Sequence, residues 1–183
     1  MPWARPFGMA RSVGRYEGGT PFAGAIGRYK YARRIELADP FGRLLLSVFR
    51  AGWPAGTVDI VAPVPLHRFK HWKRGFNQAY LLIRKWPEWG VSDVRVVPEL
   101  LCRVRPTRTQ AGLSAEARES NLRGAFRLHP EARLMGRRVL LVDDVLTTGA
   151  TAGACAEALR AAGAASVDVL TLGRAPRLRE MVD

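Results

Sequence analysis

At 183 residues, the chain has the length of one domain, and its 48% hydrophobic and 25% charged residues exclude intrinsic disorder. Its net charge of +13 predicts a surface that attracts polyanions, whether nucleic acid, phosphate esters or an acidic protein. The two cysteines lie far apart, which argues against a zinc site or a disulfide framework. No apolar run suits a signal peptide or a membrane span, so the cytoplasm is the expected compartment.

The first part of the chain predicts an irregular element followed by a helix and a strand. Residues 1–38 show no sustained period and are expected to form a small covering element, separate from a domain at 39–183. Apolar residues at helical spacing then predict an amphipathic helix that stops at Gly52 and Pro54: Phe41, Leu44, Leu45, Val48 and Phe49. The β-branched run at 58–64 predicts a buried strand.

The middle of the chain predicts a helix, a strand and a long loop. Asn77 is a suitable N-cap for a helix, and a short strand is expected at 94–97. Residues 103–124 are rich in arginine and have few large apolar side chains, so we expect a long mobile loop. Long loops inside compact domains are often active-site lids.

The last part of the chain predicts a strand, a helix and a second strand. An apolar strand at 138–142 leads into a helix that ends at Gly163, and the final strand is expected at 167–172. This order of elements predicts βαβ crossovers and an α/β fold with a mainly parallel sheet flanked by helices. Ligands in such sheets bind beyond the carboxyl ends of the strands.

The segment 139–151, VLLVDDVLTTGAT, carries the strongest chemical signal. Asp143 and Asp144 are expected where the strand ends, and two carboxylates there accept hydrogen bonds from vicinal hydroxyls or hold a divalent cation. The turn that follows leads into a helix whose free N–H groups and hydroxyls suit a phosphate monoester: Thr147, Thr148, Gly149, Ala150 and Thr151. The pattern therefore predicts a ribose 5-phosphate site. The alternative is that the aspartates cap a turn and the threonines cap the helix.

A basic segment at 66–78 follows the strand at 58–64 and is expected near the same edge of the sheet. Its charged residues suit the pyrophosphate of an activated sugar: His67, Arg68, Lys70, Lys73 and Arg74. A solvated basic loop or a contact to nucleic acid is the alternative.

Four segments carry a resemblance to a known family. The segment 139–151 resembles the phosphoribosyl pyrophosphate (PRPP) motif of type I phosphoribosyltransferases. The segments 64–79 and 102–126 and the patch Tyr29-Lys30-Tyr31 resemble the ComF/GntX family of phosphoribosyltransferase-like proteins, which is associated with DNA uptake in natural competence. The resemblance covers about residues 26–173 and implies a type I phosphoribosyltransferase-like fold with a small N-terminal hood at 1–38.

The resemblance also implies the ligand and its contacts. PRPP would bind with Mg²⁺, and Asp143 and Asp144 would meet the ribose hydroxyls while 147–151 surround the 5-phosphate. The residues expected near pyrophosphate are Leu66, His67, Arg68 and Arg74. The flexible loop closing over the site would include Arg103, Thr107, Arg118 and Asn121. Arg105 and Gln110 join the two aspartates as candidate catalytic residues. The alternative is that Arg105 and Gln110 are surface residues of a loop without a catalytic role.

One departure from the family concerns zinc. Family members usually begin with a four-cysteine zinc element, and no cysteine precedes Cys102, so we expect no zinc. The implied reaction is displacement of pyrophosphate from PRPP by an unassigned nitrogen or oxygen acceptor. The alternatives are a non-catalytic module that binds single-stranded DNA or a DNA-uptake helicase, and a PRPP-sensing regulator; a homo-oligomer is left open.

Overall fold

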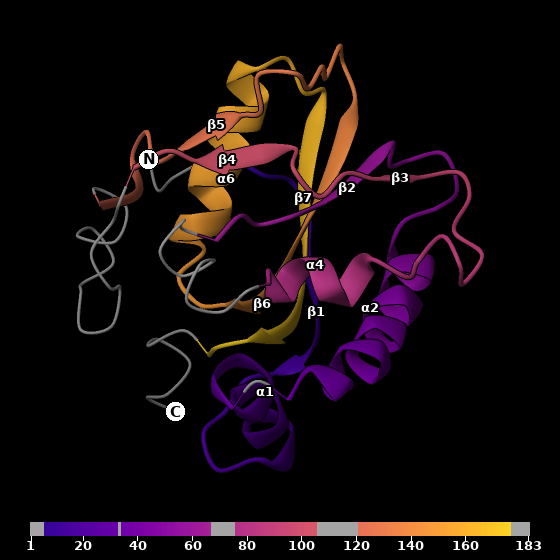
Figure 1. The fold of residues 1–183 in the computed structure, drawn as a ribbon, viewed down its shortest axis with the longest axis vertical. Helices are drawn as coiled ribbons and strands as arrows, with labels where there is room; N and C mark the ends of the chain where they lie inside the picture. Colours follow the sequence, from indigo (N-terminus) through magenta and orange to yellow (C-terminus); the bar gives the residue numbers. More distant parts are fainter. Residues whose placement is uncertain (1–5, 33, 67–75, 106–120, 177–183) are drawn as a thin grey trace.

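The structure is a computed structural model that describes residues 6–32, 34–66, 76–105 and 121–176 (Figure 1). Its centre is a five-stranded sheet with the strand order β1-β7-β6-β2-β3. The strands are β1 (Ala10–Arg15), β2 (Ile60–Pro63), β3 (Arg95–Val96), β6 (Arg138–Leu146) and β7 (Ser166–Arg174). All neighbouring strands in this sheet pair in parallel, which confirms the predicted mainly parallel α/β fold.

Two hydrophobic cores cover the two faces of the sheet, because successive residues of a strand point to opposite sides. Val139 and Leu141 of β6 belong to one core, and Leu140 and Val142 belong to the other. The first core contains α6 (Ala150–Ala161) and a small antiparallel sheet of β4 (Leu101–Arg103) and β5 (Phe126–Leu128). The second contains α1 (Pro21–Tyr31), α2 (Ala38–Gly52) and α4 (Gln78–Ile83), and the 3₁₀ turn η1 (Ile35–Leu37) joins α1 to α2.

The helix predicted after Pro40 is α2, and its buried side differs slightly from the expected one. Phe41, Leu45 and Phe49 are buried as a row four residues apart, and Leu46 joins them. Leu44 remains 43% exposed because it lies outside this row, so its expected place in the apolar stripe was wrong.

The N-terminal region contains a strand that the sequence analysis missed. Residues 1–38 were expected to cover the domain, but β1 extends the main sheet by pairing with β7 from Ala10↔Val169 to Arg15↔Arg174. An edge strand is half-exposed along its length and shows little apolar periodicity, which explains the missed prediction. After β1, Thr20 caps α1 by accepting a hydrogen bond from the Ala23 N–H at 3.2 Å.

The remaining predicted helices and strands are confirmed with shifts in their bounds, whereas most of the loop expected at 103–124 lies outside the described residues. β2, β3 and β7 match the strands expected at 58–64, 94–97 and 167–172, and Gly163 follows the end of α6 with a positive φ of 93°. β4 and β5 were missed because each has only three residues. Within the described residues, no helix is long and apolar enough to cross a bilayer.

Candidate functional site

The acidic pair lies inside strand β6, not beyond its end as the sequence analysis expected. β6 continues to Leu146 because β7 keeps pairing with it, with Asp143 opposite Thr171 and Leu146 opposite Arg174. On its other side β6 pairs with β2 only as far as Val142. Asp143 and Asp144 therefore stand on the part of β6 that projects past the paired end of β2, at the carboxyl edge of the sheet.

The two carboxylates project from opposite faces of β6. Asp144 is next to Lys30 on α1, and the Lys30 Nζ lies 2.9 Å from Oδ1 of Asp144. Asp143 interacts electrostatically with Arg103, at the end of β4, and with Cys155 on α6. The backbone N–H of Asp144 donates a hydrogen bond of 2.8 Å to Oδ1 of Asp143. Asp144 therefore faces α1 on one side of the sheet, and Asp143 faces β4 and α6 on the other.

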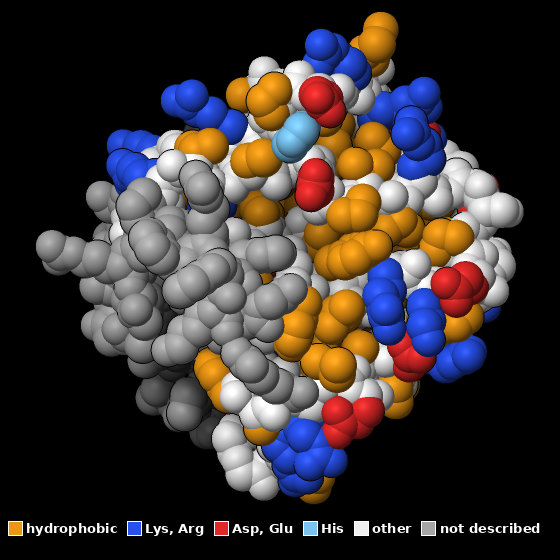
Figure 2. Space-filling view, in the orientation of Figure 1, with side chains coloured by type: hydrophobic (Ala, Val, Ile, Leu, Met, Phe, Trp, Pro, Cys, Tyr) orange, Lys and Arg blue, Asp and Glu red, His pale blue; other side chains and the backbone are white. Residues whose placement is uncertain are grey.

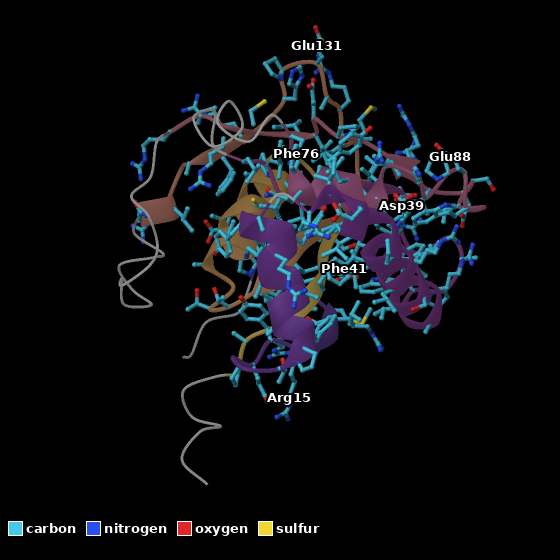
Figure 3. All side chains as sticks on the ribbon, turned by 60° about the horizontal axis from the view of Figure 1, so that its bottom comes forward. Arg15, Asp39, Phe41, Phe76, Glu88 and Glu131 are labelled. Atoms are coloured by element: carbon cyan, nitrogen blue, oxygen red, sulfur yellow. The ribbon has the colours of Figure 1, made fainter. Side chains whose placement is uncertain are left out.

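Lys30 is held against Asp144 by the packing of α1 on α4. The Tyr29 hydroxyl donates a hydrogen bond of 2.7 Å to the Gln78 carbonyl, and the Gln78 side-chain amide donates one of 3.2 Å to the Lys30 carbonyl. The Tyr29 ring also packs edge-on against Phe41 of α2, with 5.7 Å between ring centroids. Figure 3 shows α1 in front, with Phe41 beside it. Although burial lowers the pKa of Lys30, the neighbouring carboxylate of Asp144 outweighs it and leaves that pKa raised.

The pKa of the Asp143 carboxyl group is raised well above its ordinary value. Burial and the charge of Asp144 raise the pKa of Asp143 to about 7, while Lys30, Arg103 and the Asp144 N–H oppose the rise. Arg103 is itself partly buried, and its guanidinium carbon lies 5.3 Å from the ring centroid of Phe126. Burial lowers the pKa of Arg103. A carboxyl group poised near neutrality at the edge of a parallel sheet is typical of a functional site.

The turn after β6 leads through Gly149 into the N-terminus of helix α6. Gly149 is the N-cap of α6 with a φ of 84°, a conformation that glycine adopts without strain. Thr147 and Thr148 are exposed, and the Ala150 N–H donates a hydrogen bond of 3.3 Å to Oγ1 of Thr148. The N–H groups of the first helical turn and the positive end of the helix dipole suit an anion. The role of 147–151 in phosphate binding stays a prediction.

The basic segment 66–78 is described only at its ends. Asn77 caps α4 by accepting a hydrogen bond of 3.0 Å from the Ala79 N–H, and its side-chain amide donates one of 3.1 Å to the Val64 carbonyl. Asn77 therefore ties the start of α4 to the end of β2. Among the residues predicted for pyrophosphate, only Leu66 is described, because His67, Arg68 and Arg74 lie outside the described residues.

Only some of the residues predicted for the flexible loop are described, and among these Arg103 interacts with the acidic pair. Arg103 interacts with Asp143, as described above. Arg105 is exposed, and its Nη2 donates a hydrogen bond of 3.1 Å to the Asn121 carbonyl, so these two residues contact each other. Gln110, Thr107 and Arg118 lie outside the described residues, and their roles stay predictions.

A groove of about 930 Å³ lies beyond the carboxyl ends of β2 and β3. Figure 2 shows hydrophobic side chains gathered on this face, with both basic and acidic side chains around them. The lining includes Leu66, Phe76, Tyr80, Pro98, Arg103 and His129. Arg103 lines the groove and also interacts electrostatically with Asp143, so this residue links the groove to the acidic pair, although neither aspartate lines the groove.

Sequence reasoning did not find the ion pair between Lys30 and Asp144. Lys30 was noted only as part of the patch that resembles the family, and nothing in its local pattern indicates a partner 114 positions away. Among the described residues, no third His, Cys, Asp or Glu joins the two aspartates to form a metal-binding group.

Comparisons with a protein-family model and with individual proteins agree on one family for this chain. Residues 75–183 match the family described as "Phosphoribosyl transferase domain". DNA utilization protein YhgH of Escherichia coli K12 is 41% identical over 157 residues, which cover 84% of this chain and 67% of the relative.

Two further relatives agree with this result. DNA utilization protein YhgH of Salmonella typhi is 39% identical over 176 residues, covering 94% of this chain and 73% of the relative. Competence protein F of Haemophilus influenzae is 36% identical over 159 residues, covering 85% of this chain and 69% of the relative. The resemblance found in the sequence is confirmed, and the chain belongs to the ComF-type group of the phosphoribosyl transferase domain family.

Proposed function

We propose that this protein binds PRPP at the carboxyl end of β6 and transfers its phosphoribosyl group to an acceptor, with release of pyrophosphate, in a process linked to DNA uptake. The observation that carries the proposal is the acidic pair on β6, followed directly by a turn with Gly149 at the start of α6. This arrangement supports a ribose at Asp143 and Asp144 and its 5-phosphate at the helix N-terminus. The names of the relatives, DNA utilization protein and competence protein, support the link to DNA.

The residues of the site would act by binding and orienting the sugar. Carboxylate oxygens accept hydrogen bonds from the ribose hydroxyls, and negative charge near the ring favours the positive charge that develops on it as pyrophosphate leaves. The dipole of α6 and the N–H groups of its first turn hold the 5-phosphate, so the ribose is fixed at both ends. We expect Arg103, which lines the groove and interacts with Asp143, to contact the leaving group or the acceptor.

Mg²⁺ fits this proposal as a partner of PRPP. Only two carboxylates meet at the site among the described residues, and one of them is paired with Lys30, so the chain offers no complete set of oxygen ligands there. Mg²⁺ commonly binds through substrate phosphates and one or two carboxylates. Bound to pyrophosphate, the ion would neutralise charge on the leaving group.

The second candidate is a non-catalytic module that binds single-stranded DNA or a helicase. The net charge of +13 favours it, because a basic surface attracts a polyanion. Two carboxylates at the edge of the sheet suit the vicinal hydroxyls of a ribose, which the sugar of DNA lacks. We therefore place PRPP at the acidic pair and expect any DNA contact on other surfaces.

Titrations of PRPP with Mg²⁺ and of single-stranded DNA separate the two candidates. The double variant Asp143→Asn/Asp144→Asn should lose PRPP binding and keep or gain DNA affinity. The charge-matched control is Glu88→Gln/Asp93→Asn, which changes two exposed acidic residues outside the site and should bind PRPP normally (Figure 3 labels Glu88). Equal loss of both ligands in the first variant would refute separate sites, and unchanged PRPP binding would refute the proposed function.

A further inference from the structure

The hairpin formed by β4 and β5 carries several arginines and no acidic side chain among its described residues. The two arms, 100–105 and 121–128, contain Arg103, Arg105, Arg123 and Arg127 but no aspartate or glutamate. Figure 2 shows Lys and Arg side chains, without acidic ones, on the described surface around β5, whose place Figure 1 gives. The hairpin is therefore the more basic part of a face that elsewhere mixes both charges.

Arg123 and Arg127 have guanidinium groups that are available to a ligand. Both residues are exposed, and within the described part of the chain neither has a hydrogen-bond or ion-pair partner. Arg15 and Arg34, in contrast, each form an ion pair with a glutamate two positions away. An unpaired guanidinium offers its charge and its planar set of N–H donors to phosphate oxygens. The hairpin therefore presents two free phosphate-binding groups.

The groove described above lies on the same hairpin as these arginines. Cys102 and Val104 line the groove, and Arg127 is the register partner of Cys102. Because paired residues of antiparallel strands project from the same face, Arg127 and the groove share one face of the hairpin. Val104 is 52% exposed, and the groove lining also includes the aromatic residues Phe76 and Tyr80. Free cations thus stand beside an apolar and aromatic groove.

This combination suits single-stranded nucleic acid. Arginines contact the phosphates of a strand, and unpaired bases stack on aromatic side chains. The bases of a duplex are already paired and stacked, so a duplex would gain only the arginine contacts. Glu99 and His129 also line the groove, and Glu99 precedes β4. We therefore expect the phosphates toward the other end of the hairpin, where Arg105 contacts Asn121.

We propose that the β4–β5 hairpin binds single-stranded DNA, with phosphates at Arg123 and Arg127 and bases in the groove. The choice of DNA over RNA rests on the link to DNA uptake in the proposed function, whereas the surface is inferred from the described residues alone. Neither Asp143 nor Asp144 lines the groove, so this surface is separate from the acidic pair.

The test uses the full chain and fluorescence anisotropy of a labelled oligothymidylate at several salt concentrations. Arg123→Gln/Arg127→Gln removes the two free cations, and Tyr80→Leu removes a ring from the groove without changing the charge. Arg15→Gln/Arg34→Gln is the matched control, because it lowers the net charge equally at two exposed arginines that are already paired. Figure 3 labels Arg15, at the end of the molecule opposite Glu131.

We expect Arg123→Gln/Arg127→Gln to reduce the slope of log K against log salt by about 1.4, or about 0.7 for each phosphate contact. This change corresponds to a loss of DNA affinity of roughly 25-fold at about 0.1 M salt. Tyr80→Leu should weaken DNA binding at least about fivefold with an unchanged slope, the effect of losing one stacked base. The control variant should keep the slope of the unaltered chain.

Equal losses in the hairpin variant and the control would mean that DNA responds only to net charge, and would overturn the inference. Duplex DNA or oligouridylate bound as tightly as oligothymidylate would overturn it too, as would an unaltered chain that binds no oligothymidylate. Thermal unfolding shows whether each variant is folded. An abasic strand tests the groove on the unaltered chain: it should bind more weakly than oligothymidylate with the same slope, and equal binding would remove the bases from the groove.

The inference and the proposed function can fail independently. PRPP binding with Mg²⁺, measured by calorimetry, should be the same in Arg123→Gln/Arg127→Gln as in the unaltered chain. If the unaltered chain binds no PRPP, the proposed function fails, while the DNA titrations still decide whether the hairpin binds the strand.

Discussion

The raised pKa of Asp143 makes a prediction about stability that needs no ligand. Burial and the charge of Asp144 raise the pKa of this carboxyl group from 3.8 to about 7 in the folded chain. Between about pH 4 and pH 7 the folded state therefore binds a proton that the unfolded state has released, and the free energy of unfolding falls as the pH rises. Above about pH 8 both states are ionised, and the contribution becomes constant.

The size of this effect follows from the shift in pKa. A rise from 3.8 to about 7 corresponds to a loss of up to about 4 kcal/mol between pH 4 and pH 8. Asp143→Asn removes the titrating group, so this variant should gain stability relative to the unaltered chain as the pH rises. At about 2–4 °C per kcal/mol for a chain of this size, the relative gain in unfolding midpoint is up to roughly 8–16 °C.

Thermal unfolding of both proteins at pH 5, 6, 7 and 8 measures the effect directly. Other titrating groups contribute equally to the two proteins, except those facing Asp143, which are Asp144, Lys30, Arg103 and Cys155. The midpoint of Asp143→Asn should rise relative to that of the unaltered chain from pH 5 to pH 8. A difference that is the same at every pH would refute the conclusion that the folded structure raises the pKa of Asp143.

Three other predictions test the neighbouring parts of the site. PRPP affinity should rise from pH 6 to pH 8 in the unaltered chain, because ionised Asp143 accepts hydrogen bonds more strongly, and calorimetric titration should show a smaller rise in Asp143→Asn. Tyr29→Phe removes the hydrogen bond from the Tyr29 hydroxyl to the Gln78 carbonyl and should cost about 0.5–1.5 kcal/mol, or roughly 1–6 °C in midpoint; an unchanged midpoint would mean that this bond does not fasten α1. Gly149→Ala and Gly163→Ala each place alanine at a positive φ, at opposite ends of α6, and each should cost about 1–2 kcal/mol of stability. Only Gly149→Ala should also weaken PRPP binding, and equal PRPP binding by the two variants would refute a phosphate site at the N-terminus of α6.

The central sheet could be predicted because its buried strands are continuous apolar runs. Val139 to Val142 and Ile60 to Val64 contain no polar residue and are buried throughout, as expected for strands covered on both faces. β1 carries no such run because it lies at the sheet edge, where Arg11 and Arg15 remain exposed. The pattern of buried strands therefore defines the centre of a parallel sheet better than its edge.

The chemistry of the candidate site was predictable in part. The acidic residues and the turn with Gly149 are adjacent in the sequence, so their proximity follows from one strand and one turn. Their environment depends on distant segments: Lys30 arrives on α1, and Arg103 arrives on the short strand β4. The opposite orientation of the two carboxylates was missed because the strand was expected to stop at Val142, before the pairing with β7 had ended.

The most direct test of a PRPP site on β6 is thermal unfolding with and without PRPP and Mg²⁺. Ligand at 100 times its Kd should add about 2.7 kcal/mol, which raises the midpoint of a chain of this size by roughly 5–11 °C. We expect this rise in the unaltered chain and its loss in Asp143→Asn/Asp144→Asn. No rise at millimolar PRPP, or an equal rise in the double variant, would contradict the assignment of the acidic pair to the ribose.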